Sequence, residues 1–217
     1  MKELSVIRID ACGGISAADL PELLDMACVE WQKIDELNWH EFPYRPSVEF
    51  RIAHVASAIL LHYRVSEQSV AAVAANDNGN VWEDSCVEFF SMPGGDGIYY
   101  NVECNCAGTL LIGAGVNRED RELAPPQMFD NVLRWASLGR EPFAERMEHT
   151  TWEVALVLPV EVYFKHRVDS LGGCTMAANF FKCGDRLSRP HFLSWNPVFT
   201  PSPDFHRPEC FGRLHFE

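Results

Sequence analysis

The chain has 217 residues, 47% of them hydrophobic, which is enough apolar material to bury a full core without disulfide or metal support. Its formal net charge of -13, with 31 acidic against 18 basic residues, argues against a nucleic-acid partner and an anionic membrane surface, because both require clustered Lys and Arg. A neutral polar ligand is a better match for an acidic chain with 12% aromatic residues.

The N-terminal stretch MKELSVIR lacks the apolar core of a secretory signal, and acidic residues come early. No apolar run approaches the roughly 18 residues that a transmembrane helix needs. We therefore expect no membrane partner, and a cytoplasmic protein if Met1 is the native start.

The first predicted element is a short amphipathic helix from Asp19 to about Glu30. Apolar side chains at helical spacing indicate it, namely Leu20, Leu23, Leu24 and Ala27. The preceding Ser16-Ala17-Ala18-Asp19 resembles a capping box. We interpret this helix as a packing element.

The rest of the chain alternates between apolar and polar residues in short runs separated by turn residues, which is typical of strands. The predicted strands are 48–52, 58–65, 70–75, 85–92, 98–106, 132–138, 151–158 and 174–182. Aromatic residues and prolines in 31–47 indicate an edge strand and irregular loops, and 159–165 is ambiguous and could form a short helical turn. Because no repeat or linker interrupts the chain, we expect one domain, residues 1–217, folded as an antiparallel two-sheet β-sandwich with one short N-terminal helix.

The two strands 85–92 and 98–106 are joined by a glycine-rich turn and carry the most informative polar residues. Because alternate side chains share a face, Asn101 and Glu103 are expected on one face of the second strand, with Val102, Cys104 and Cys106 on the other. Glu88 lies in the first strand, and the polar turn 76–80 is expected to present Trp82 just before it. An indole plate beside carboxylates and amides is sugar-binding chemistry, although a half-exposed strand with a rim Trp would give the same pattern.

The eight cysteines show no CxxC spacing and mostly lie in apolar strand contexts. We therefore expect reduced core thiols rather than disulfides, and no zinc site. The expected reduced pair Cys104 and Cys106 faces the core.

Several segments resemble carbohydrate-binding module family 9 and its DOMON-like relatives, in particular a stand-alone subgroup. The motifs are VWEDSCVEFF at 81–90, YYNVE at 99–103, SWNP at 194–197, FHRPE at 205–209 and FGRL at 211–214. The resemblance covers about residues 17–217. It implies a jelly-roll or immunoglobulin-like sandwich that binds a saccharide without catalysis, in connection with polysaccharide breakdown.

In that family two tryptophans clamp a terminal sugar, with polar residues between them. The resemblance assigns Trp82 and Trp195 to the two plates and Glu88 to the acidic contact. It assigns Asn101 and Glu103 to polar sugar contacts, where sugar-binding members can carry a basic residue and an amide instead. Two weaker candidates flank this set, Asn179 and His191.

The resemblance also allows a structural calcium ion, and no other cofactor is expected. Oxygen ligands for calcium are available near the turn that precedes Trp82: Asp77, Asn78, Asn80 and Asp84. Their spacing is not that of an EF-hand.

Two alternative functions stay open at this stage. Glu88 and Glu103 on neighbouring strands could form a glycosidase pair, with one carboxyl as the acid and the other as nucleophile or base. The chain could also be a protein-interaction sandwich whose sugar site has degraded. The sequence leaves the identity of the sugar and the oligomeric state open.

Overall fold

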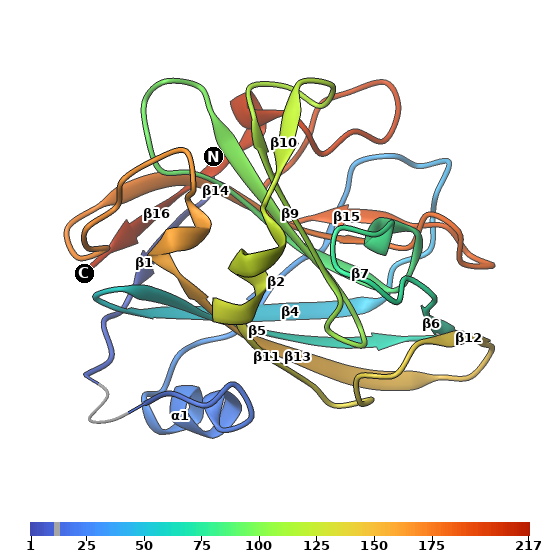
Figure 1. Cartoon of the computed structure of the whole chain (residues 1–217). Helices are drawn as coiled ribbons and strands as arrows, with labels where there is room; N and C mark the ends of the chain where they lie inside the picture. Colours follow the sequence, from blue (N-terminus) through green and yellow to red (C-terminus); the bar gives the residue numbers. More distant parts are fainter. Residues whose placement is uncertain (11–13) are drawn as a thin grey trace.

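The structure is a computed structural model that describes residues 1–10 and 14–217. Two large sheets face each other across a shared core, as the β-sandwich prediction requires (Figure 1). The nine-stranded sheet runs in the order β1-β16-β14-β7-β8-β9-β10, with β15 and β3 attached beside β14. The five-stranded sheet runs β11-β13-β5-β4-β2, and β12 pairs with β6 as a short ribbon. Neighbouring strands are antiparallel except β1 and β16, which are parallel.

The strands of the nine-stranded sheet are β1 (Glu3–Val6), β3 (Glu36–Leu37), β7 (Cys86–Met92), β8 (Tyr99–Asn105), β9 (Leu110–Gly115), β10 (Arg121–Leu123), β14 (Thr175–Cys183), β15 (Phe192–Ser194) and β16 (Gly212–Phe216). Those of the five-stranded sheet are β2 (Gln32–Lys33), β4 (Ser47–Val55), β5 (Ala58–Glu67), β11 (Leu133–Ala136) and β13 (Thr150–Pro159). The ribbon consists of β6 (Val70–Ala72) and β12 (Phe143–Arg146). Short 3-10 helices are η1 (Val81–Glu83), η2 (Pro126–Asn131), η3 (Val160–Val162) and η4 (Pro208–Cys210).

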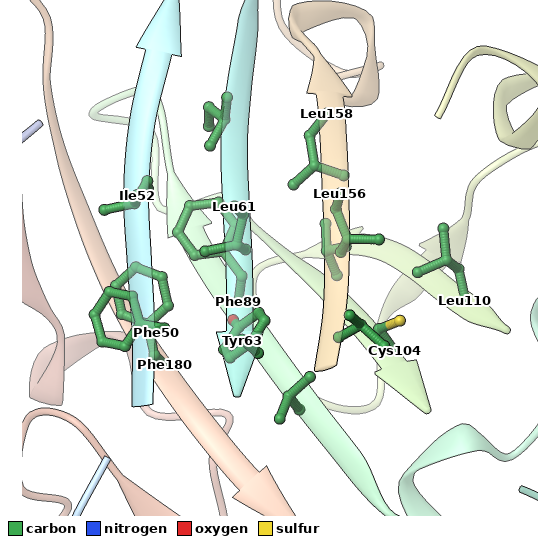
Figure 2. Packing of buried hydrophobic residues seen from close by; sticks show 14 of the residues in the cluster. Phe50, Ile52, Leu61, Tyr63, Phe89, Cys104, Leu110, Leu156, Leu158 and Phe180 are labelled. Atoms are coloured by element: carbon green, nitrogen blue, oxygen red, sulfur yellow. The ribbon is translucent and has the colours of Figure 1, made fainter. Parts of the chain in front are cut away.

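The core lies between the two sheets and takes every second side chain from each strand. Phe50 of β4 stacks on Phe180 of β14 with ring centroids 3.7 Å apart, so the two sheets are in direct aromatic contact (Figure 2). Val102, Cys104 and Cys106 belong to this core cluster, which confirms their predicted face. The opposite face of β7 and β8 therefore points away from the five-stranded sheet.

The helix α1 (Leu20–Met26) covers the outer face of the five-stranded sheet (Figure 1). Leu20 and Leu24 are fully buried there, as expected of a packing element. The helix is shorter than the predicted 19–30, because the chain turns at Cys28, whose φ of 53° lies in the left-handed region. The predicted capping box is wrong: Asp19 is the N-cap residue, and the Ser16 Oγ instead accepts from the N–H of Ala18.

A buried charged cluster ties the two sheets together at one end of the core. Lys182 of β14 lies 3.0 Å from the carboxylate of Glu67, the last residue of β5, and 2.7 Å from Nε2 of His191. Its ammonium also donates to the carbonyl of Cys183 at 2.8 Å, and the indole N–H of Trp152 donates to Glu67 at 2.6 Å. Because Lys182, Glu67 and His191 are all inaccessible to solvent, each depends on the others for its polar contacts.

Seven described cysteines are free thiols, and the eighth, Cys12, lies outside the described residues. Four of the seven are buried, whereas Cys28 is exposed and Cys174 and Cys210 are half-buried. None of the helices in the described part of the chain combines the length and the apolarity that a membrane crossing requires.

Candidate functional site

A cavity of about 290 Å³ opens on the outer face of the nine-stranded sheet. Its floor is formed by side chains that alternate with the core residues of β7, β8, β9 and β14, namely Glu88, Asn101, Glu103, Leu111 and Cys183. The walls come from four connecting segments and from the strands β10 and β15. The cavity therefore brings together four of the five predicted site residues, Trp82, Glu88, Asn101 and Glu103.

Two carboxyl groups meet on the cavity floor. Glu88 of β7 and Glu103 of β8 are direct partners in the strand register, and both are at most 5% exposed. Burial, reinforced by the nearby charge of Glu103, raises the pKa of Glu88 well above its usual range. Burial likewise raises the pKa of Glu103 to about 7, against the opposing effect of the hydrogen bond from Asn101. None of the ion pairs in residues 1–10 and 14–217 includes either carboxylate.

Asn101 connects Glu103 to a cation at the cavity edge. Its amide nitrogen donates to Glu103 Oε1 at 2.7 Å, and its amide oxygen accepts from the guanidinium of Arg121 at 3.1 Å. That guanidinium also lies over the ring of Tyr99, 4.4 Å from its centroid. The second carboxylate oxygen of Glu103 is buried and has no hydrogen-bond partner within the described chain. A ligand hydroxyl in the cavity could satisfy this oxygen.

Trp82 lies in η1, directly after the polar turn 76–80, and is half-buried at the cavity wall. The backbone fixes this position, because the N–H of Asp185 donates to the carbonyl of Trp82 at 3.2 Å. Asp185 also lines the cavity, and burial raises its pKa to about 6. The loop after β14 therefore fixes the backbone of Trp82 and adds a third carboxyl to the wall.

The C-terminal segment forms another part of the lining. Phe205 stacks on Phe181 with ring centroids 4.2 Å apart, and His206 is hydrogen bonded through Nδ1 to the hydroxyl of Tyr99 at 2.9 Å. Burial, with the nearby charges of Arg121 and Arg118, lowers the pKa of His206 to about 3, so its imidazole is neutral. This wall is thus apolar and uncharged apart from Asp204, which pairs with Arg207 at 3.0 Å.

Trp195 does not line the cavity, so its predicted place opposite Trp82 needs correction. Its side chain is 3% exposed and packs edge-on against Phe50 and Phe180 in the core between the sheets. Gly212 makes room for it, because a Cβ there would lie 2.5 Å from the indole ring. Trp195 is therefore part of the core between the two sheets and not part of the cavity wall.

The two flank candidates also lie elsewhere. Asn179 is buried and bonds the backbone around Asn196, donating to its carbonyl at 3.0 Å and accepting from its N–H at 2.9 Å. His191 belongs to the buried cluster with Lys182. Both residues bond other parts of the protein, and neither of them lines the cavity.

The carboxylates among the calcium candidates already have protein partners. Asp77 accepts from both guanidinium nitrogens of Arg134, at 2.6 and 2.8 Å. Asp84 accepts from the N–H groups of Val73 and Ala74 and from the amide of Asn105. These bonds brace the turn that carries Trp82.

Sequence reasoning missed most of the cavity walls. The ionisable lining residues that were not predicted are Arg118, Arg121, Cys183, Asp185, Asp204 and His206. One signal was available: alternation in the strand 174–182 extends one residue further and places Cys183 on the same face as Phe181. The other residues reach the cavity through loops whose paths no local pattern fixes.

Taken together, the lining suits a small neutral polyol. A half-buried indole and several apolar side chains can cover the apolar face of a sugar ring, while carboxylates and amides bond its hydroxyls. Acidic and basic groups are both present, with Arg118 and Arg121 near the acidic floor, so the site has no strong preference for a charged ligand.

Comparison with known proteins agrees with this chemistry. Residues 18–216 match the model of carbohydrate-binding family 9. A crystal structure of a candidate carbohydrate-binding protein from Bacteroides uniformis has 51% sequence identity and a TM-score of 0.98, covering 100% of this chain and 99% of that chain.

Two structures of a carbohydrate binding module family 9 from Caldicellulosiruptor kristjanssonii share the fold at 12% identity. One is a complex with glucose, with a TM-score of 0.59, covering 100% of this chain and 96% of that chain. The other is a complex with cellotriose, with a TM-score of 0.57, covering 100% and 94%. No curated protein matches the chain.

Proposed function

The chain belongs to carbohydrate-binding family 9, and on that premise we propose that it binds a neutral saccharide in the cavity above Glu88 and Glu103. The observation that supports this most directly is the buried Glu103 oxygen that lacks a partner within the described chain while its carboxylate lines the cavity. A sugar hydroxyl is a hydrogen-bond donor that could satisfy it without bringing a charge.

In this proposal the indole of Trp82 covers the apolar face of the sugar. Leu111, Phe192 and Phe205 supply the remaining apolar lining. Glu88 and Glu103 bond hydroxyls from the floor, and Asn101 holds Glu103 in place. The volume of about 290 Å³ is at the lower end of the range of roughly 300–1,000 Å³ for small-molecule sites, which favours one or two sugar rings.

A role in polysaccharide breakdown is part of the same proposal, with the protein holding short saccharides rather than cleaving them. A glycosidase needs one protonated and one ionised carboxyl, set apart by their environments. Here burial raises the pKa of both Glu88 and Glu103, and neither carboxylate has an ion-pair partner in the described chain that would keep it ionised as the nucleophile or base. Lack of turnover on a panel of aryl glycosides would agree with a binding protein.

Isothermal titration calorimetry with glucose, cellobiose, xylose and glucuronate tests the proposal. We expect micromolar to millimolar affinity for a neutral sugar, roughly -8 to -4 kcal/mol, with little dependence on salt. Trp82→Ala should remove most of the affinity and keep the wild-type circular dichroism spectrum. If no neutral sugar binds at millimolar concentration, or if the variant binds as well as the parent, the proposal is wrong, and the protein-interaction alternative gains weight.

A further inference from the structure

Two cysteines from distant parts of the chain meet at the cavity floor. Cys86 begins β7 and Cys183 ends β14, and the two residues are direct partners in the antiparallel register. Both thiols are at most 1% exposed and lie on the outer face of the sheet, the face that carries Glu88. Neither thiol has a role in the proposed contacts with a saccharide.

The carboxyl of Glu88 completes a compact group with these thiols. The two Sγ atoms and one carboxylate oxygen all lie within 4.8 Å of one another. The Cys183 thiol donates to Glu88 Oε1 at 3.1 Å, so one sulfur and one oxygen of the group are already in contact. Cys183 and Glu88 line the cavity, which gives the group an access route.

No basic side chain of the described chain is paired with this group, since no Lys, Arg or His forms an ion pair with Glu88. Cysteine binds zinc as the thiolate, so a divalent ion held by two thiolates and one carboxylate would displace the thiol protons and leave a net charge of −1 (+2 − 3) on the site.

We propose that Cys86, Cys183 and Glu88 bind a zinc ion at the cavity floor. Two sulfur ligands select a thiophilic ion over calcium or magnesium, which take oxygen ligands. Zinc bonds to sulfur at about 2.3 Å and to carboxylate oxygen at about 2.0–2.2 Å, so tetrahedral ligands are roughly 3.3–3.8 Å apart. The observed spacing needs only small side-chain shifts to reach that geometry.

The fourth coordination position faces the cavity. Asp185 follows Cys183 by two residues and lines the same cavity, so the fourth ligand is its carboxylate or a water molecule. With Glu88 Oε1 directed to the metal, its other oxygen remains for a ligand in the cavity. The metal site does not depend on the saccharide proposal, because its ligands and their geometry are independent of any sugar.

Cobalt titration of the full chain tests the proposal. The protein is reduced with a phosphine, freed of metal with a chelator and dialysed, and cobalt(II) is then added. We expect one equivalent to bind with thiolate-to-cobalt charge-transfer absorption and visible d–d bands. Zinc should then displace the cobalt, because a site with thiolate ligands binds zinc more tightly than cobalt. Cys86→Ser and Cys183→Ser should each abolish the charge-transfer band, whereas the exposed-thiol control Cys28→Ser should keep it.

The wild-type melting temperature gives a second readout that does not require the variants to fold. One equivalent of zinc should raise it, because an ion bound only by the folded chain stabilises that state. Absence of a charge-transfer band, its persistence in both serine variants, or no zinc effect on melting would overturn the proposal. So would a Cys86–Cys183 disulfide in unreduced protein, seen by mass spectrometry as the loss of two hydrogens. Sugar calorimetry on metal-free protein separates a failure here from a failure of saccharide binding.

Discussion

Glu88 and Glu103 face each other directly across β7 and β8, and both carboxyl groups line the same cavity. Two like charges in register destabilise a strand pair, and burial makes their ionisation more costly still. The pair is therefore a local weakness of the fold, tolerated at the place where a ligand would contact it.

This weakness makes the stability depend on pH. The pKa of Glu103 is about 7 in the folded chain against an ordinary 4.5, so folding strengthens proton binding at this carboxyl. Its contribution to stability is then greatest below pH 4.5 and is lost as the pH rises toward 7. Glu103→Gln should be more stable than wild type at pH 8, by on the order of 1–3 kcal/mol, with little difference at pH 5. Urea denaturation at both pH values measures this. Equal effects at the two pH values would contradict it, and the exposed Glu161→Gln is the control.

Trp82 and Trp195 should differ in what their removal costs. Trp195→Ala leaves a void between Phe50, Phe180 and Gly212, so we expect a loss of about 3–5 kcal/mol in the free energy of unfolding. Trp82→Ala should cost much less, because its side chain is only half-buried at the cavity wall. Chemical denaturation of both variants compares them. A larger loss for Trp82→Ala would mean that Trp82 is mainly a structural residue.

Gly113 controls the position of Asn101. It lies opposite Asn101 in the register of β8 and β9, and a Cβ on it would lie 2.8 Å from the Asn101 amide oxygen. Gly113→Ala should therefore displace the amide that holds Glu103 and weaken saccharide binding about ten-fold, or about 1.4 kcal/mol. Gly95→Ala in the β7–β8 turn meets no atom within 4 Å and is the matched control. Unchanged affinity in Gly113→Ala would show that Asn101 does not position Glu103 for binding.

Lys182 should be one of the most sensitive positions of the core. Lys182→Met removes the cation and leaves the buried carboxylate of Glu67 without its ion-pair partner, which we expect to cost about 3–5 kcal/mol. Adding Glu67→Gln should recover part of that loss, since the amide carries no charge. A double-mutant cycle by urea denaturation measures the coupling. If the two losses simply add, the pair does not link the sheets energetically.

The strand pattern could be predicted because each strand places one face in a common core. Alternation around Val102 and Cys104 identified both faces of β8, and the shared face of Asn101 and Glu103 follows from it, whereas the site role of Glu88 was assigned by the family resemblance. The pairing order of the strands could not be predicted, because it depends on contacts between distant segments. The parallel pair β1 and β16, which joins the two ends of the chain, has no local signature.

The predicted site residues of the β7–β8 hairpin do line one cavity, whereas the lining that comes from distant segments of the chain was not predicted. Cys183 meets Cys86 across 97 positions of sequence (183 − 86), so no short spacing motif could indicate the pair. Trp195 followed the family pattern, but its backbone N–H donates to the carbonyl of Phe180 and its ring turns into the core.

The alternation of β7 and β8 also bears on how faithfully this hairpin forms. A slip of one residue would turn Glu88 and Glu103 into the space between the sheets and expose Val87 and Phe89 on the cavity side. Such a misaligned hairpin would bury carboxylates in the most apolar part of the molecule, and it could not compete with the native pairing. The two glutamates of the cavity floor thus also lower the stability of the slipped strand pairing relative to the native one. Replacing both with apolar residues would reduce this difference in free energy between the two pairings.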